Sequence, residues 1–190
     1  MNRRRMMTTL AGGVVAAGYA GRATAATAPE ASPAAEGNLP VASAKAAKDF
    51  PGAKELPDPN TDYKVVFSVS AKVKDDEVHP TLKMIGLYLN TLAHNGVPAK
   101  NRHIAAMFHQ GGGDVVFQND VYKARHNGAD NPNIAVLKEL HEAGVALHVC
   151  GQGLIGKKVE PSQLLPGVQA DLWAMVTMVN LQARGYVRVG

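Results

Sequence analysis

From about residue 61 onward, short runs of β-branched and aromatic residues alternate with longer stretches in which apolar residues recur every three or four positions. This alternation is the strongest constraint on the fold, because strands separated by helices pair in parallel and pack helices on the faces of their sheet. Strands are predicted over 63–69, 103–109, 145–150 and 186–189. Helices are predicted over 80–95, 119–126, 133–143 and 171–184. The pattern predicts an α/β fold, a three-layer flavodoxin-like sandwich with a mainly parallel sheet of about five strands.

Two further segments of this domain carry specific expectations. The glycine-rich run at 110–113 is predicted to be a turn, and 114–118 to be a short extra strand or a loop. The last helix is expected to bury one apolar stripe against the sheet, made of Leu172, Met175, Val176 and Val179.

The first 25 residues have the composition of an export signal. A basic run, Arg3 to Arg5, precedes an apolar and small-residue stretch over 10–20, and Ala23-Thr24-Ala25 fits a cleavage site. The paired arginines, with Arg22 close to the cleavage site, are typical of a twin-arginine signal, which is an address and not an anchor. We therefore expect a periplasmic protein without stable membrane insertion after cleavage, with an ordinary secretory signal or an uncleaved anchor as the alternatives.

The next segment, 26–60, is rich in alanine, proline and small polar residues. Such a composition buries too little apolar surface to offset the entropy of ordering, so it predicts a flexible or surface-hugging tail. Residues 61–190 then form one α/β domain of ordinary size.

The net positive charge of the chain comes from the predicted signal. The full sequence has 20 basic and 16 acidic residues, and four of the arginines fall within 1–25, which leaves 16 of each sign. A neutral chain without a cluster of lysine, arginine and aromatic residues is not typical of nucleic-acid binding, so no such partner is expected.

Cys150 is the only cysteine, and it ends an apolar strand just before a glycine. In parallel α/β sheets, ligands bind beyond the carboxyl ends of the strands, so a thiol here is placed for chemistry as a nucleophile or a sulfur carrier. A free cysteine is also a common buried hydrophobic residue, which is the structural alternative. The chain has no second cysteine with which to form an intramolecular disulfide.

The stretch from Val136 to Leu154, a helix closed by glycine, a strand and then Cys150-Gly-Gln-Gly, resembles the DsrE/DsrF-like family of sulfur-relay proteins. The segment Leu181–Tyr186 also resembles the end of the exported branch of that family. The resemblance implies the fold given above, a homotrimer or homohexamer, and a cysteine that carries a persulfide and passes sulfur to a partner protein. It identifies Cys150 as the catalytic, persulfide-bearing residue.

Neighbouring residues are expected to bind or orient the sulfur. The amides of Gly151, Gln152 and Gly153 can form a nest that donates to a thiolate or a terminal persulfide sulfur. The resemblance places His109 and Gly111 in a His-Gly turn after the second strand, here interrupted by Gln110. The lysines at 157 and 158 supply positive charge if their loop folds back, and are otherwise solvated.

No metal site and no cofactor are expected. His148 and Cys150 share one face of a strand, but no further ligand follows at a usual spacing. The other histidines besides His109 are interpreted as surface or half-buried positions: His79, His94, His103, His126 and His141.

The sequence therefore leaves three functions open. The first is an exported sulfur carrier or sulfurtransferase-like protein that uses Cys150 as its persulfide site. The second is a non-catalytic oligomeric module of the same fold that binds a small ligand or a partner, with a structural cysteine. The third is a redox-sensing thiol.

Overall fold

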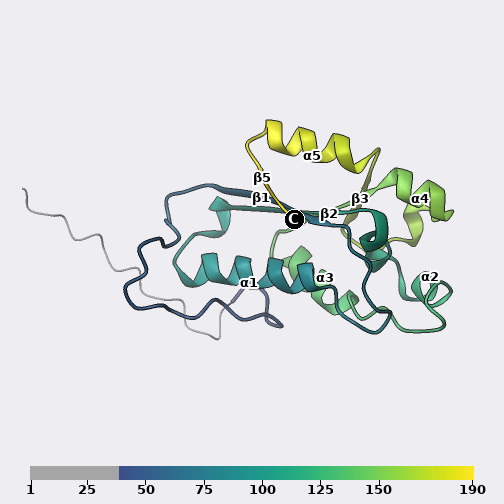
Figure 1. The fold of residues 1–190 in the computed structure, drawn as a ribbon, viewed down its shortest axis with the longest axis horizontal. Coiled ribbons are helices and arrows are strands. Elements are labelled where there is room, and N and C mark those ends of the chain that lie inside the picture. The colour runs from purple at the N-terminus through teal and green to yellow at the C-terminus, as the bar shows by residue number, and fades with distance from the viewer. Residues whose placement is uncertain (1–38) are drawn as a thin grey trace, which may run out of the picture. The chain divides into compact units, whose positions relative to one another are not determined.

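The computed structural model describes residues 39–190, which form a five-stranded sheet in the order β4-β3-β2-β1-β5 (Figure 1). Every neighbouring pair of strands is parallel. The strands are β1 (Tyr63–Val69), β2 (Arg102–Phe108), β3 (Ala146–Cys150), β4 (Val168–Asp171) and β5 (Val187–Val189). The expected α/β fold is confirmed, and the predicted signal peptide lies outside the described residues.

The helices lie on both faces of the sheet, in the three layers that the sequence predicts. They are α1 (Pro80–His94), α2 (Asn119–Lys123), α3 (Ile134–Glu142), α4 (Gly151–Lys157) and α5 (Ala174–Ala183), with short 3-10 turns η2 (Ala99–Asn101), η3 (Gln110–Val116) and η4 (Pro161–Gln163). Successive strands β1, β2 and β3 step in one direction, so right-handed crossovers place α1 and α3 on the same face. The chain then steps back past β1 to form β5, so α5 covers the opposite face (Figure 1).

The larger core lies between the sheet and the helices α1 and α3. It includes Val65, Phe67 and Val69 of β1 and the helix residues Leu89 and Leu140, all buried. Each strand contributes every second residue to this face, as the pleat requires.

The smaller core lies under α5 and holds the thiol. Val66, Ala105, Met107 and Cys150 from the sheet pack against Ala174, Met178 and Leu181 from the helix. Small side chains at Ala105 and Ala174 let α5 approach this face closely.

The expected inner face of the last helix is wrong. Leu172, Met175, Val176 and Val179 are 73%, 55%, 40% and 57% exposed, whereas Ala174, Thr177, Met178 and Leu181 are buried. The apolar residues of this helix lie on all of its sides, so their spacing does not predict which face is buried. The expected helix also starts too early, because Asp171 is the last residue of β4 and α5 begins at Ala174.

Two elements near the thiol have weak sequence signals. The strand β4 reads VQAD, a short edge strand without clear alternation. The helix α4 reads GQGLIGK, and glycine is a poor helix former, so the sequence suggested a loop there. The predicted turn at 110–113 is the start of η3, which continues to Val116, and Phe117 makes a single antiparallel bridge to Leu164.

The segment from residue 39 to the start of β1 packs on α1 and α3. Val41 is fully buried, and the side chain of Asn90 accepts from its N–H at 3.0 Å and donates to its carbonyl at 2.8 Å. Ser43 donates through both its N–H and its hydroxyl to Glu139 on α3. No helix within 39–190 has the length and hydropathy needed to cross a membrane.

His79 is buried at the start of α1, and the surface or half-buried position expected for it is wrong. Its Nδ1 accepts from the N–H of Thr81 at 3.2 Å and its Nε2 donates to the carbonyl of Ala71 at 3.1 Å. These two contacts fit the neutral ring, and burial lowers the pKa of His79 below its ordinary value.

This buried neutral histidine predicts a pH dependence of stability. The folded protein takes up the His79 proton less readily than the unfolded chain, whose pKa is near 6.5. The stability that His79 contributes is therefore present above about pH 6.5 and is lost as the pH falls through the lower pKa of the folded state. We expect the free energy of unfolding in urea to fall less between pH 7.5 and 5.5 in His79→Gln than in the wild type. An equal fall in both proteins contradicts the assignment.

Candidate functional site

The carboxyl ends of β2, β3 and β4 bring together one thiol, two histidines and one carboxylate. Cys150 and Asp171 are register partners at the ends of β3 and β4. His109 follows the register pair Phe108–Val149 by one residue, so it lies beside Cys150. His148 precedes Cys150 by two residues and shares its face of the sheet, toward α5.

The thiol of Cys150 is buried, at 7% exposure, and lies at the starts of two helices. Cys150 immediately precedes α4, and its Sγ accepts a hydrogen bond from the N–H of Ala174, the first residue of α5, at 3.4 Å. The first N–H groups of a helix have no partner within the helix and carry its positive end. This contact therefore gives the sulfur atom a hydrogen-bond donor at the positive end of α5.

The predicted nest residues form the first turn of α4. A Cβ on Gly151 would lie 2.6 Å from the carbonyl oxygen of Asp171, so only glycine fits between β3 and β4. The side chain of Gln152 donates to the carbonyl of Leu172 at 3.2 Å. Gly153 has room for a Cβ, whose nearest neighbour would be the Cβ of Cys150 at 3.9 Å.

A small cavity adjoins Cys150 at this edge of the sheet. The volume of this cavity is about 10 Å³, which is about the space that one water molecule needs. Its polar or small lining residues are His109, Gln110, Gly113, Cys150, Gly153 and Lys157. A single additional sulfur atom on Cys150 is therefore of the size that this space can hold.

His109 and Gly111 lie in the turn beside this cavity. His109 Nε2 lies 2.9 Å from the hydroxyl of Ser68, and burial, with a smaller effect of Arg188, lowers the pKa of His109. Its ring is therefore neutral at neutral pH. A Cβ on Gly111 would lie 2.7 Å from the backbone nitrogen of Lys72, so this glycine permits the close approach of the loop after β1.

Asp171 is a site residue that sequence reasoning missed. Its Oδ2 lies 2.9 Å from His148 Nδ1 and accepts from the Thr177 hydroxyl at 2.8 Å, while Gln169 donates to its Oδ1 at 2.6 Å. Asp171 therefore joins β3 to α5 and fixes His148 with a proton on Nδ1. The register of β4 against β3 makes this pair, and the sequence carried no clear signal for β4.

Lys157 and His126 both contact Asp114, close to the turn beside the thiol. Lys157 forms an ion pair with Asp114 and donates to the carbonyl of Gln110 at 3.0 Å. His126 is buried with its two ring nitrogens 2.7 Å from Asp75 and 3.3 Å from Asp114, so the surface or half-buried position expected for it is wrong. Lys158 ends α4 in the left-handed conformation.

The side chains at this edge of the sheet are not arranged as metal ligands. Within residues 39–190, no group of three or more histidine, cysteine, aspartate or glutamate side chains is placed to hold a metal ion. His148 presents Nδ1 to Asp171 instead.

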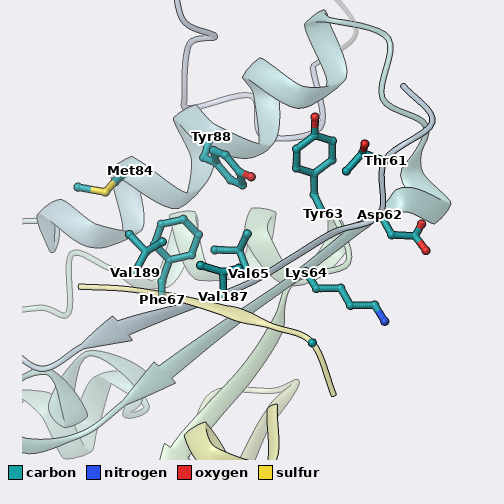
Figure 2. Close-up of a pocket in the computed structure, with 11 residues that line it drawn as sticks. Thr61, Asp62, Tyr63, Lys64, Val65, Phe67, Met84, Tyr88, Val187 and Val189 are labelled. Carbon is teal, nitrogen blue, oxygen red and sulfur yellow. The ribbon is translucent and has the colours of Figure 1, made fainter. Parts of the chain in front are cut away.

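A larger apolar groove lies away from Cys150, between α1 and the strands β1 and β5 (Figure 2). Its volume is about 560 Å³, and Phe67, Val187 and Val189 line it together with Tyr63 and Tyr88. Phe67 and Tyr88 meet edge to face, with ring centroids 5.8 Å apart. The groove suits apolar binding and contains none of the predicted site residues.

The contacts of Asp171 predict a specific effect of Asp171→Asn. The amide removes the charge that pairs with His148, so we expect a loss of about 1–3 kcal/mol in the free energy of unfolding. The nitrogen chemical shifts of the His148 ring should also move, because the proton on Nδ1 loses its carboxylate acceptor. Asp120→Asn is the matched control, since Asp120 is exposed on α2. Equal stability of the two variants, with unchanged His148 shifts, would contradict this role.

Comparison with known proteins identifies the family. Residues 24–189 match the sequence model of the DsrE/DsrF-like family. Among solved structures, the chain is similar to MTH1491, a protein of unknown function from Methanobacterium thermoautotrophicum, with 24% identity and a TM-score of 0.49 over 67% of this chain and 100% of that one. Among curated proteins, none matches the chain. Since the family match spans nearly the whole sequence, the chain belongs to the DsrE/DsrF-like family.

Proposed function

We propose that this protein is an exported sulfur carrier in which Cys150 holds sulfur as a persulfide. The observation that carries the proposal is the placement of Sγ at the end of β3, where it accepts the N–H of Ala174 and Cys150 lines a cavity for one more atom. Membership of a family with sulfur-relay proteins supports the same role.

The chemistry needs only a thiolate and a donor. The Cys150 thiolate attacks the transferable sulfur of the donor, an S–S bond forms, and the donor leaves with the electron pair of its broken bond. In the second half, an acceptor thiolate attacks the outer sulfur, and Cys150 leaves as a thiolate. Because the chain has no other cysteine, the acceptor must be another molecule.

The surrounding residues have defined parts in this proposal. The N–H of Ala174 stabilises the sulfur anion before and after loading. Gly151 keeps β3 and β4 close enough for that contact. His109, neutral and held by Ser68, lines the cavity where the added sulfur would lie.

Intact-mass spectrometry of the native protein tests the carrier directly. After brief exposure to polysulfide, the wild type should gain about one or two sulfur masses, which reductant removes, while Cys150→Ser should gain none. The same mass also reports whether the exported chain begins at residue 26, as cleavage after Ala25 requires. A wild type without any sulfur adduct, and without alkylation in the absence of denaturant, would overturn the carrier.

Self-association into a homotrimer or homohexamer is part of the proposal. An apolar surface on and just before α5 supports it, formed by Leu172, Trp173, Met175, Val176 and Val179 at 40–73% exposure. Contiguous apolar surfaces of this kind mark interaction sites, and a second copy of a nearly neutral chain meets no strong charge repulsion there.

Light scattering on Val179→Lys tests this surface. We expect the wild type to have the mass of three or six chains and Val179→Lys to have a smaller mass, because a charge at this position would be buried on assembly. Ala135→Lys is the control, since Ala135 is exposed on α3, which covers the other face of the sheet. A monomeric wild type, or a Val179→Lys variant of unchanged mass, contradicts the proposal.

A non-catalytic binding module is the second candidate function. The apolar groove of Figure 2 supports it, because its volume of about 560 Å³ falls in the range of small-ligand sites. This function becomes the leading one if Cys150 proves inert in the folded protein.

A further inference from the structure

A polar pocket lies beside the thiol, at the carboxyl ends of β1 and β2. Its volume is about 250 Å³. The loop after β1, the turn η3, the end of α2 and the end of α4 line it, with Lys72, Gln110, Asp114, Arg125, His126 and Lys157 as its polar side chains. The carboxyl edge of a parallel sheet is where α/β proteins bind their ligands.

The pocket has a surplus of positive charge. Lys157 forms an ion pair with Asp114, and Asp114 is the one carboxylate that lines the pocket. The other two basic side chains, Lys72 and Arg125, form no ion pair with any carboxylate of residues 39–190. His126 lies between Asp114 and Asp75, so it offers no ring nitrogen to a ligand. Arg125 donates to the carbonyl of Lys157, which carries no charge, so the positive charges of Arg125 and Lys72 remain to attract an anion.

The pocket and the cavity of Cys150 share a wall. Gln110 and Lys157 line both spaces, and Lys157 Nζ donates to the carbonyl of Gln110. Gln110 has a φ of 51°, in the left-handed region that non-glycine residues seldom adopt. Strained residues of this kind concentrate at functional sites. The pocket that contains Lys72 and Arg125 is therefore a direct neighbour of the cavity beside the thiol.

We propose that this pocket binds the anionic end of a small sulfur donor, an oxyanion or a carboxylate, and directs its sulfur toward Cys150. The inference rests on the carrier function proposed above and adds the chemical class of the donor. The volume suits a small anion and is below the usual range for larger organic ligands.

The transfer step balances without a further reagent. With thiosulfate as donor, the Cys150 thiolate attacks the outer sulfur, the S–S bond of thiosulfate breaks, and sulfite leaves with the electron pair. With a carboxylate donor such as 3-mercaptopyruvate, the C–S bond breaks instead, and the carbon takes a proton from water. In both cases the positive pocket holds the part of the donor that leaves.

Binding is measured on the full chain with Cys150→Ser, so that no reaction follows. Thiosulfate and 3-mercaptopyruvate are titrated separately, by calorimetry, into this protein and into versions that add Lys72→Gln, or Lys72→Gln with Arg125→Gln. We expect the double change to weaken binding of the preferred donor at least about tenfold, as the loss of a charged hydrogen bond does. Lys138→Gln is the control, because Lys138 lies exposed on α3 outside the pocket.

The outcomes separate this inference from the carrier function. Tenfold weaker binding in the pocket variants, with the control unchanged, supports the pocket, and the donor that binds more tightly identifies the anion. No binding of either donor, or equal binding in all variants, overturns the pocket. If the double variant unfolds, donor binding to the Lys72→Gln variant is compared with binding to the control instead. Loading of Cys150 by polysulfide is measured separately, and its result tests the carrier function and not the pocket.

Discussion

The hydrogen bond from the N–H of Ala174 to Cys150 Sγ depends on the direction in which the chain crosses the sheet. Four strands step one way, and the return from β4 to β5 places α5 on the face opposite α1 and α3. The first free N–H of α5 is then directed at the end of β3, where the thiol lies. A helix start and a strand end thus meet at one sulfur atom, and the remainder of the site is arranged around this contact.

Three residues keep this contact in place. Asp171 is tied to His148 in β3 and to Thr177 in α5, so it fixes the helix relative to the strand that ends in Cys150. Gly151 allows the close approach of β3 and β4, and Gly111 allows that of the loops after β1 and β2. The sulfur is therefore buried and supplied with a hydrogen-bond donor.

Much of the fold could be predicted from the sequence, because β1 and α1 have strong periodic patterns whose bounds the structure nearly reproduces. The position of Cys150 at a strand end could be predicted for the same reason. The elements that complete its surroundings could not. The strand β4 is short and polar and α4 contains three glycines, so neither element was predicted, and α5 was predicted as a helix but its apolar residues on all sides left its buried face unspecified. Only through those elements does the N–H of Ala174 reach the thiol and Asp171 lie beside Cys150.

The central claim is that Cys150 is a reactive thiol in the folded protein, and its rate of alkylation by iodoacetamide tests this most directly. The rate is measured in buffer and again at low urea concentrations that leave the protein folded. We predict labelling in buffer at a rate that does not depend on urea, because a thiol that exchanges sulfur with other molecules has to be reached by small reagents while the protein is folded. Labelling that rises with urea in step with global unfolding would show a structural cysteine and contradict the account.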